Sequence, residues 1–86
     1  MDILFQDRRI VVAVKPSGVL STDEPGGMPQ RIRDCLGDAH ACVRTVHRLD
    51  AAVAGVMVLA RSRMAAELLE RHFTAVGFDR LIAAPA

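Results

Sequence analysis

The chain has 86 residues, a length that predicts one small domain and argues against a multidomain protein. With 51% hydrophobic and 24% charged residues, it has the composition of a globular protein and not of a disordered one. Its formal net charge of +1 lacks the strong positive balance that is typical of dedicated nucleic-acid binders. We therefore expect residues 1–86 to form a single globular domain.

The cysteine content and the hydropathy pattern bear on location and on metal binding. Cys35 and Cys42 are too few for a disulfide framework, and no apolar run is long enough to cross a membrane or resembles a secretory leader. We expect a cytoplasmic protein with free, half-buried thiols. His40 and His47 lie nearby, but the intervals of five, two and five residues fit no common zinc template, so we predict no metal site.

The first third of the chain predicts a β-hairpin. Residues 3–5 are apolar, residues 6–9 are polar, and residues 10–14 form a largely β-branched run that is typical of a buried strand. The tetrapeptide Lys15-Pro16-Ser17-Gly18 ends this strand. Its proline disfavours helix at the residue before it, and its glycine permits a positive φ. Residues 21–27 have the composition of a loop.

Two helices follow from turn and capping signals. Pro29 can start a short helix, and Gly37 can end it in the left-handed conformation. A longer helix is predicted over residues 62–76, with Ser62 as its N-cap and Gly77 just beyond its end.

The remaining apolar segments complete a sheet. Residues 43–46 predict a short strand, residues 51–60 a buried strand, and residues 78–84 a last strand. The sequence thus predicts an α+β fold with a mixed, largely antiparallel sheet and two helices. With little chain left to cover the last strand, we expect an exposed sheet edge and an apolar face. These would favour self-association or pairing with a complementing chain.

The tetrapeptide His47-Arg48-Leu49-Asp50 is the most informative motif, because it places an acid beside a base and a cation just before a buried strand. A carboxylate at the mouth of such a strand can be held rigidly at the edge of a cleft, where it can do chemistry. The alternative is architectural: Asp50 caps a turn and Arg48 neutralises it on the surface.

Three segments resemble the amino-terminal part of the RluA-type RNA pseudouridine synthases. Residues 3–20 are similar to that family's opening, I-L-Y-x-D followed by V-V-x-K-P-x-G-h-L, where h is apolar. Residues 46–60 are similar to its H-R-L-D-x-x-T-S-G-h-h-h-h-A motif, and the helix that begins at Ser62 lies where the family has its next helix. The resemblance implies the front half of a pseudouridine synthase catalytic domain. It also implies isomerisation of uridine to pseudouridine in structured RNA (rRNA or tRNA) without a cofactor.

The resemblance also implies roles for individual residues. Asp50 takes the place of the catalytic aspartate, which would either attack the sugar carbon or remove a proton from the sugar while the base departs. The target base must leave its stack, so Arg48 would fill the resulting gap or hold a phosphate. His47 is expected to be a hydrogen-bonded wall residue, and Lys15 either to contact the RNA backbone or to fix its turn.

The chain departs from the family pattern at several positions. Val53 and Ala54 replace the family's Thr-Ser, and Leu81 stands where the family has a tyrosine, a residue that this sequence lacks altogether. The family's later segment, which supplies a cation to the aspartate, would follow Ala86. Two interpretations therefore stay open. One is a truncated pseudouridine synthase with Asp50 as catalyst, and the other is a non-catalytic remnant that binds RNA or another protein.

Overall fold

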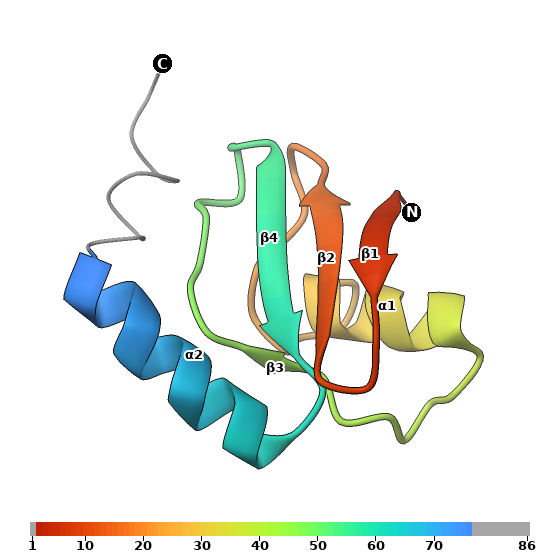
Figure 1. The fold of residues 1–86 in the computed structure, drawn as a ribbon. Helices are drawn as coiled ribbons and strands as arrows, with labels where there is room; N and C mark the ends of the chain where they lie inside the picture. The colour runs from red at the N-terminus through yellow and green to blue at the C-terminus, as the bar shows by residue number, and fades with distance from the viewer. Residues whose placement is uncertain (1, 77–86) are drawn as a thin grey trace.

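A four-stranded antiparallel sheet with two helices forms the part of the chain that the computed structural model describes, residues 2–76 (Figure 1). The elements are β1 (Ile3–Gln6), β2 (Ile10–Lys15), α1 (Met28–Leu36), β3 (Arg44–Thr45), β4 (Gly55–Ala60) and α2 (Arg63–Val76). The strands lie in the order β1-β2-β4-β3, and each neighbouring pair is antiparallel. The predicted α+β class is confirmed, and the strand predicted over residues 78–84 lies outside the described residues.

The centre of the sheet is the pairing of β2 with β4, which runs from Ile10 opposite Ala60 to Lys15 opposite Gly55. Because successive side chains of a strand point to opposite faces, alternate residues of these two strands face the core. The inward-facing residues are Val11, Ala13 and Lys15 of β2, and Met57 and Leu59 of β4. A lysine thus occupies a position that the alternation reserves for a buried side chain.

Helix α1 covers the inner face of this sheet, behind the strands in the view of Figure 1. Its residues Met28 and Ile32 are fully buried in the main hydrophobic cluster. Pro29 lies in the first turn, where its missing N–H is not needed. Gly37 ends the helix with a φ of 70°, and its N–H donates to the carbonyl of Asp34 at 3.2 Å. The predicted start and end of this helix are confirmed.

Helix α2 packs against the β4–β3 side of the sheet. Ala60 at the end of β4 contacts Ala65 and Ala66 of the helix in a small buried cluster. Small side chains allow the helix to approach the strand closely. The hydroxyl of Ser62 accepts a hydrogen bond from the N–H of Ala65 at 3.1 Å, which confirms the predicted N-cap.

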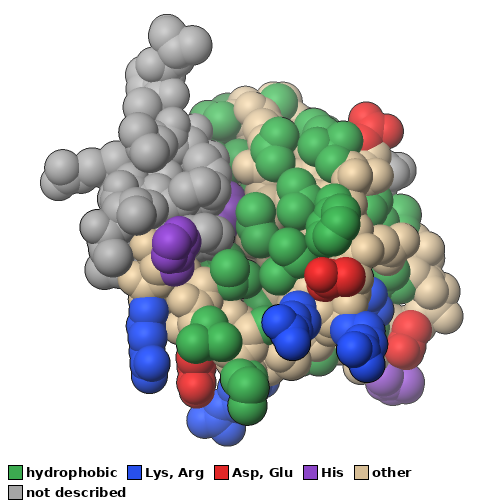
Figure 2. Space-filling model, in the orientation of Figure 1, with side chains coloured by type: hydrophobic (Ala, Val, Ile, Leu, Met, Phe, Trp, Pro, Cys, Tyr) green, Lys and Arg blue, Asp and Glu red, His purple; other side chains and the backbone are tan. Residues whose placement is uncertain are grey.

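The outer face of the sheet is apolar and largely uncovered. Phe5 of β1 lies opposite Val12, and Val14 lies opposite Val56 of β4. Phe5 and Val56 are about half exposed, and Figure 2 shows hydrophobic side chains gathered over these strands. The edge and apolar face expected beside the last predicted strand lie outside the described residues, so this exposed face of β1, β2 and β4 is a separate feature.

Three expectations differ from the structure. Residues 51–54 belong to a loop, because β4 begins only at Gly55, where its pairing with β2 begins. Lys15 is the last residue of β2 and not part of the turn. Cys35 and Cys42 are free, as predicted, but exposed rather than half-buried. Within residues 2–76, no helix has the length and hydrophobicity needed to cross a membrane.

Candidate functional site

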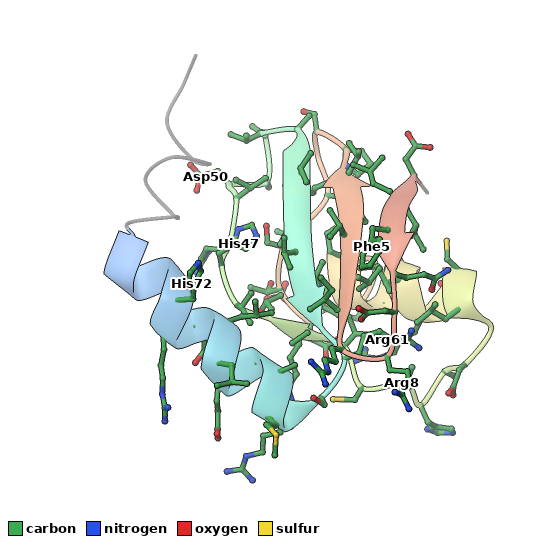
Figure 3. All side chains as sticks on the ribbon, viewed as in Figure 1. Phe5, Arg8, His47, Asp50, Arg61 and His72 are labelled. Atoms are coloured by element: carbon green, nitrogen blue, oxygen red, sulfur yellow. The ribbon has the colours of Figure 1, made fainter. Side chains whose placement is uncertain are left out.

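The candidate site is the loop between β3 and β4, and its side chains alternate between core and solvent. His47 and Leu49 are buried, whereas Arg48 and Asp50 are exposed. The loop carrying His47 and Asp50 passes beside β4, as Figure 3 shows. His47 and Leu49 therefore anchor the motif in the interior, whereas the cation of Arg48 and the carboxylate of Asp50 face solvent.

Both buried residues of the motif are fixed by named contacts. The Nε2 atom of His47 accepts a hydrogen bond from the backbone N–H of Val58 at 3.1 Å, so this ring nitrogen carries no proton. Leu49 is only 2% exposed and belongs to the main hydrophobic cluster. A Cβ atom on Gly55 would lie 3.2 Å from the Cδ1 atom of Leu49, so this close approach favours glycine at the start of β4.

A second segment, residues 15–21, holds the loop from the other side. The Ser21 hydroxyl donates to the carbonyl of Leu49 at 2.6 Å and accepts from the N–H of the same residue at 2.9 Å. The backbone N–H of Gly18 donates to the carbonyl of Ala51 at 2.6 Å. The Ser17 hydroxyl donates to the carbonyl of the next residue, Ala52, at 2.8 Å. The turn after β2, which contains Ser17 and Gly18, and the residues up to Ser21 thus form a cradle for the loop.

Lys15 completes this cradle from the interior. Its side chain is fully buried, and its Nζ atom donates to the carbonyls of Pro16 at 3.1 Å, Val19 at 2.7 Å and Ala51 at 3.0 Å. Burial lowers the pKa of Lys15 from its usual value, and the attraction of the Asp50 carboxylate opposes that shift. A buried ammonium with three carbonyl partners has no surface left for the RNA backbone, so its position favours the turn-fixing role.

The carboxylate of Asp50 takes no part in this framework. The turn after the motif is closed by the backbone, with the N–H of Val53 donating to the carbonyl of Asp50 at 2.9 Å. Within residues 2–76, the ion pairs join other residues, Arg33 with Asp23 and Arg63 with Glu67, and not Arg48 with Asp50. The architectural alternative, in which Arg48 neutralises a capping Asp50, finds no support among these contacts.

Two hollows of the described surface lie beside α1 and do not include Asp50. The larger, of about 520 Å³, lies between Asp23 and Arg33 on one side and Arg44 and Thr45 of β3 on the other. On the first side, Arg33 makes a bidentate contact with Asp23, in which both N···O distances are 2.9 Å. Asp50 therefore belongs to neither of these two hollows of the described residues. No cluster of three potential metal-ligating His, Cys, Asp or Glu side chains occurs among the described residues either.

Sequence reasoning named four site residues and missed a fifth. His47, Arg48 and Asp50 lie in one loop, with His47 facing the core and the other two exposed, and Lys15 contacts the loop backbone at Ala51. The sequence predicts only a loop at Ser21, yet its hydroxyl makes two short contacts to the motif, of 2.6 and 2.9 Å. Its 28-residue separation from Leu49 leaves no local signal in the sequence.

Comparisons with known proteins agree with this arrangement. Residues 9–81 match the RNA pseudouridylate synthase family. The chain is 38% identical over 76 residues to the dual-specificity RNA pseudouridine synthase RluA of Yersinia pestis, covering 85% of this chain and 36% of that protein. It is 38% identical over 74 residues to RluA of Escherichia coli strain K12, covering 83% of this chain and 33% of the relative.

A solved structure gives the same result. Human RNA pseudouridylate synthase domain containing 4 superimposes with a TM-score of 0.68 and 30% sequence identity, over 86% of this chain and 30% of the human one. The chain thus spans about a third of the length of these relatives. The motifs, the fold and these matches agree: the chain belongs to the RNA pseudouridylate synthase family and is similar to its RluA-type members.

Proposed function

We propose that this chain supplies the catalytic aspartate, Asp50, for the conversion of uridine to pseudouridine in RNA. The observation that carries the proposal is the contrast between the carboxylate and its backbone. Hydrogen bonds fix the residues on both sides, Leu49 and Ala51, while the carboxylate itself is exposed and not used in the described framework. A carboxylate on a fixed backbone, whose oxygens make none of the framework contacts within residues 2–76, is available to act on a substrate.

The chemistry asks for three changes at one nucleoside. The bond between C1′ and N1 breaks, the uracil turns, and C5 forms the new bond to C1′ as the C5 proton is lost and N1 gains one. The Asp50 carboxylate would attack C1′ as a nucleophile and be displaced when C5 bonds there, or remove a proton from the sugar as a base and later return it. Both routes require an ionised carboxylate, and the buried ammonium of Lys15 attracts it electrostatically.

The partner in this proposal is structured RNA, either ribosomal or transfer RNA. The target base has to leave its stack to reach Asp50. Arg48 is exposed two residues before it, so its guanidinium would occupy the vacated space or bind a neighbouring phosphate. The exposed free cysteines, Cys35 and Cys42, are compatible with a reducing cytoplasm, which we propose as the location.

A second candidate function is a non-catalytic module that binds RNA. The observation in its favour is that the chain covers only about a third of the length of its relatives. Catalysis depends on a preorganised surrounding, so we expect the 86-residue chain by itself to turn over slowly. The exposed β1 edge and the apolar outer face are where we propose that a complementing chain or a second copy would pair.

The substitution Asp50→Asn separates the two functions. Pseudouridine is quantified by mass spectrometry in total RNA from cells that produce the wild-type chain, Asp50→Asn, the control Asp34→Asn, or no chain. Asp34 is an exposed carboxylate on α1, so its substitution is expected to leave pseudouridine formation unchanged. Chain-dependent pseudouridine that Asp50→Asn abolishes supports catalysis. RNA binding without any chain-dependent pseudouridine supports the second function and refutes the first.

A further inference from the structure

The Ser21 hydroxyl makes an unusual pair of contacts with a single residue of the catalytic motif. It donates to the Leu49 carbonyl at 2.6 Å and accepts from the Leu49 N–H at 2.9 Å. The serine is 4% exposed, so water cannot readily replace either bond. A hydroxyl can make both contacts because it carries one donor and two acceptor lone pairs.

We propose that Ser21 is a positioning residue for Asp50, an inference that rests on the proposed catalytic role of that aspartate. Ser21 fixes the Leu49 residue immediately before Asp50, while Lys15 and Gly18 fix the Ala51 carbonyl immediately after it. Hydrogen bonds thereby fix the backbone immediately before and immediately after Asp50. The backbone that carries its exposed side chain is therefore held on both sides, and within residues 2–76 the carboxylate itself makes none of these hydrogen bonds.

The hydrogen bonds before Asp50, at Leu49, and those after it, at Ala51, differ in how easily they are lost. The Ala51 carbonyl has two donors, Lys15 and Gly18, so losing one leaves the other. Among the described residues, the backbone groups of Leu49 make their two hydrogen bonds with Ser21. Removing the Ser21 hydroxyl therefore releases both backbone groups of Leu49 at once. A displacement of about 1 Å at a reacting group can lower the rate about 100-fold, even when its cause lies away from the chemistry.

Other hydroxyls near the loop lack this property. Ser17 donates to the carbonyl of Ala52, two residues after Asp50, and its side chain is exposed to water. Water can replace the contact of Ser17 but not those of Ser21. Ser17→Ala is therefore a matched control for Ser21→Ala, since each substitution removes one hydroxyl from the same cradle.

The experiment combines backbone exchange with reaction rate, in the full 86-residue chain. Amide hydrogen exchange at Leu49 is measured by NMR for wild type, Ser21→Ala and Ser17→Ala, and for Ile32→Val as a control for general loss of core packing. Single-turnover pseudouridine formation and RNA affinity are measured with excess protein on a uridine-containing RNA. Ser21→Thr and Ser21→Val complete the set, because they share a shape and differ by the hydroxyl.

We expect Leu49 to exchange at least tenfold faster in Ser21→Ala, and not in Ser17→Ala or Ile32→Val. The single-turnover rate is expected to fall about 100-fold with RNA affinity unchanged, and Ser21→Thr is expected to recover more of both properties than Ser21→Val. Unchanged exchange at Leu49 overturns the proposal, as does an unchanged rate in an active chain. If the wild-type chain shows no turnover, the proposed catalytic function fails separately. The exchange data, with NMR measurements of Asp50 side-chain mobility, then decide whether Ser21 holds the aspartate.

Discussion

Replacing the buried lysine tests how the cradle is stabilised. In Lys15→Met the apolar stem is kept while the ammonium and its three donated hydrogen bonds are lost. The Ala51 carbonyl still accepts from Gly18 at 2.6 Å, and the Pro16 carbonyl still accepts from the N–H of Val19 at 3.4 Å. Of the three acceptors, the Val19 carbonyl is the one left without a donor among the described residues.

The magnitude follows from this count. An orphaned buried carbonyl costs about 1–3 kcal/mol, and the weakened Ala51 and Pro16 contacts add to that cost. Relief from burying an ammonium acts in the opposite direction. We expect a net loss of about 2 kcal/mol in the free energy of unfolding. For a domain of this size, that corresponds to a fall of roughly 8–16 °C in the melting temperature.

Thermal and urea unfolding followed by circular dichroism provide the assay. Ser17→Ala is the control, because its exposed hydroxyl makes a single contact and its loss should change the free energy of unfolding by less than about 1 kcal/mol. A Lys15→Met protein that melts at or above the wild-type temperature would refute the reasoning. It would mean that the cost of burying the ammonium exceeds the benefit of its three hydrogen bonds.

Two further predictions concern the loop that leads into α1. In Gly27→Ala the new Cβ atom collides with the backbone carbonyl of Thr22, so we expect urea unfolding to show a loss of about 3 kcal/mol in the free energy of unfolding. In Gly37→Ala only the positive φ is strained, and the expected loss is roughly 1–2 kcal/mol. A smaller loss for Gly27→Ala than for Gly37→Ala would contradict this. The second prediction concerns the exposed ion pair of Arg33 with Asp23, whose hydrogen bonds hold the pKa of the Asp23 carboxyl below its ordinary value of 3.8. The stabilisation from this ion pair is therefore present above pH 3.8 and is lost as the pH falls through the lowered pKa of Asp23. We expect Asp23→Asn to be less stable than wild type by up to about 1 kcal/mol at neutral pH and equally stable in strong acid. A difference that persists in urea unfolding at pH 2 would count against it.

Local chemistry made much of the fold predictable. The Ser62 N-cap and the left-handed Gly37 at the end of α1 depend on residues within a few positions of each other, so the sequence alone indicates them. The hairpin of β1 and β2 is similarly local. The same is true of the position of Asp50 in the loop before β4, which follows from the change from a polar motif to an aliphatic run.

Burial of Lys15 depended on register, although a signal was available. Val11, Ala13 and Lys15 alternate along β2 and share its inward face. A charged residue beside a Pro-Ser-Gly turn nevertheless suggests an exposed position. The strand continues to Lys15 because β4 continues to Gly55 opposite it, and that pairing joins segments that lie 40 residues apart in sequence number.

By itself, the sequence determined the family, the α+β class, the helix boundaries that capping residues set, and the aspartate on which the proposed chemistry depends. Each of these depends on residue types that lie close together along the chain. Only the tertiary structure decided that Lys15 is buried and that the Ser21 hydroxyl makes hydrogen bonds with both backbone groups of Leu49 within the motif. These facts arise when the loop before β4 folds against the turn after β2, a meeting of distant segments that no local spacing encodes.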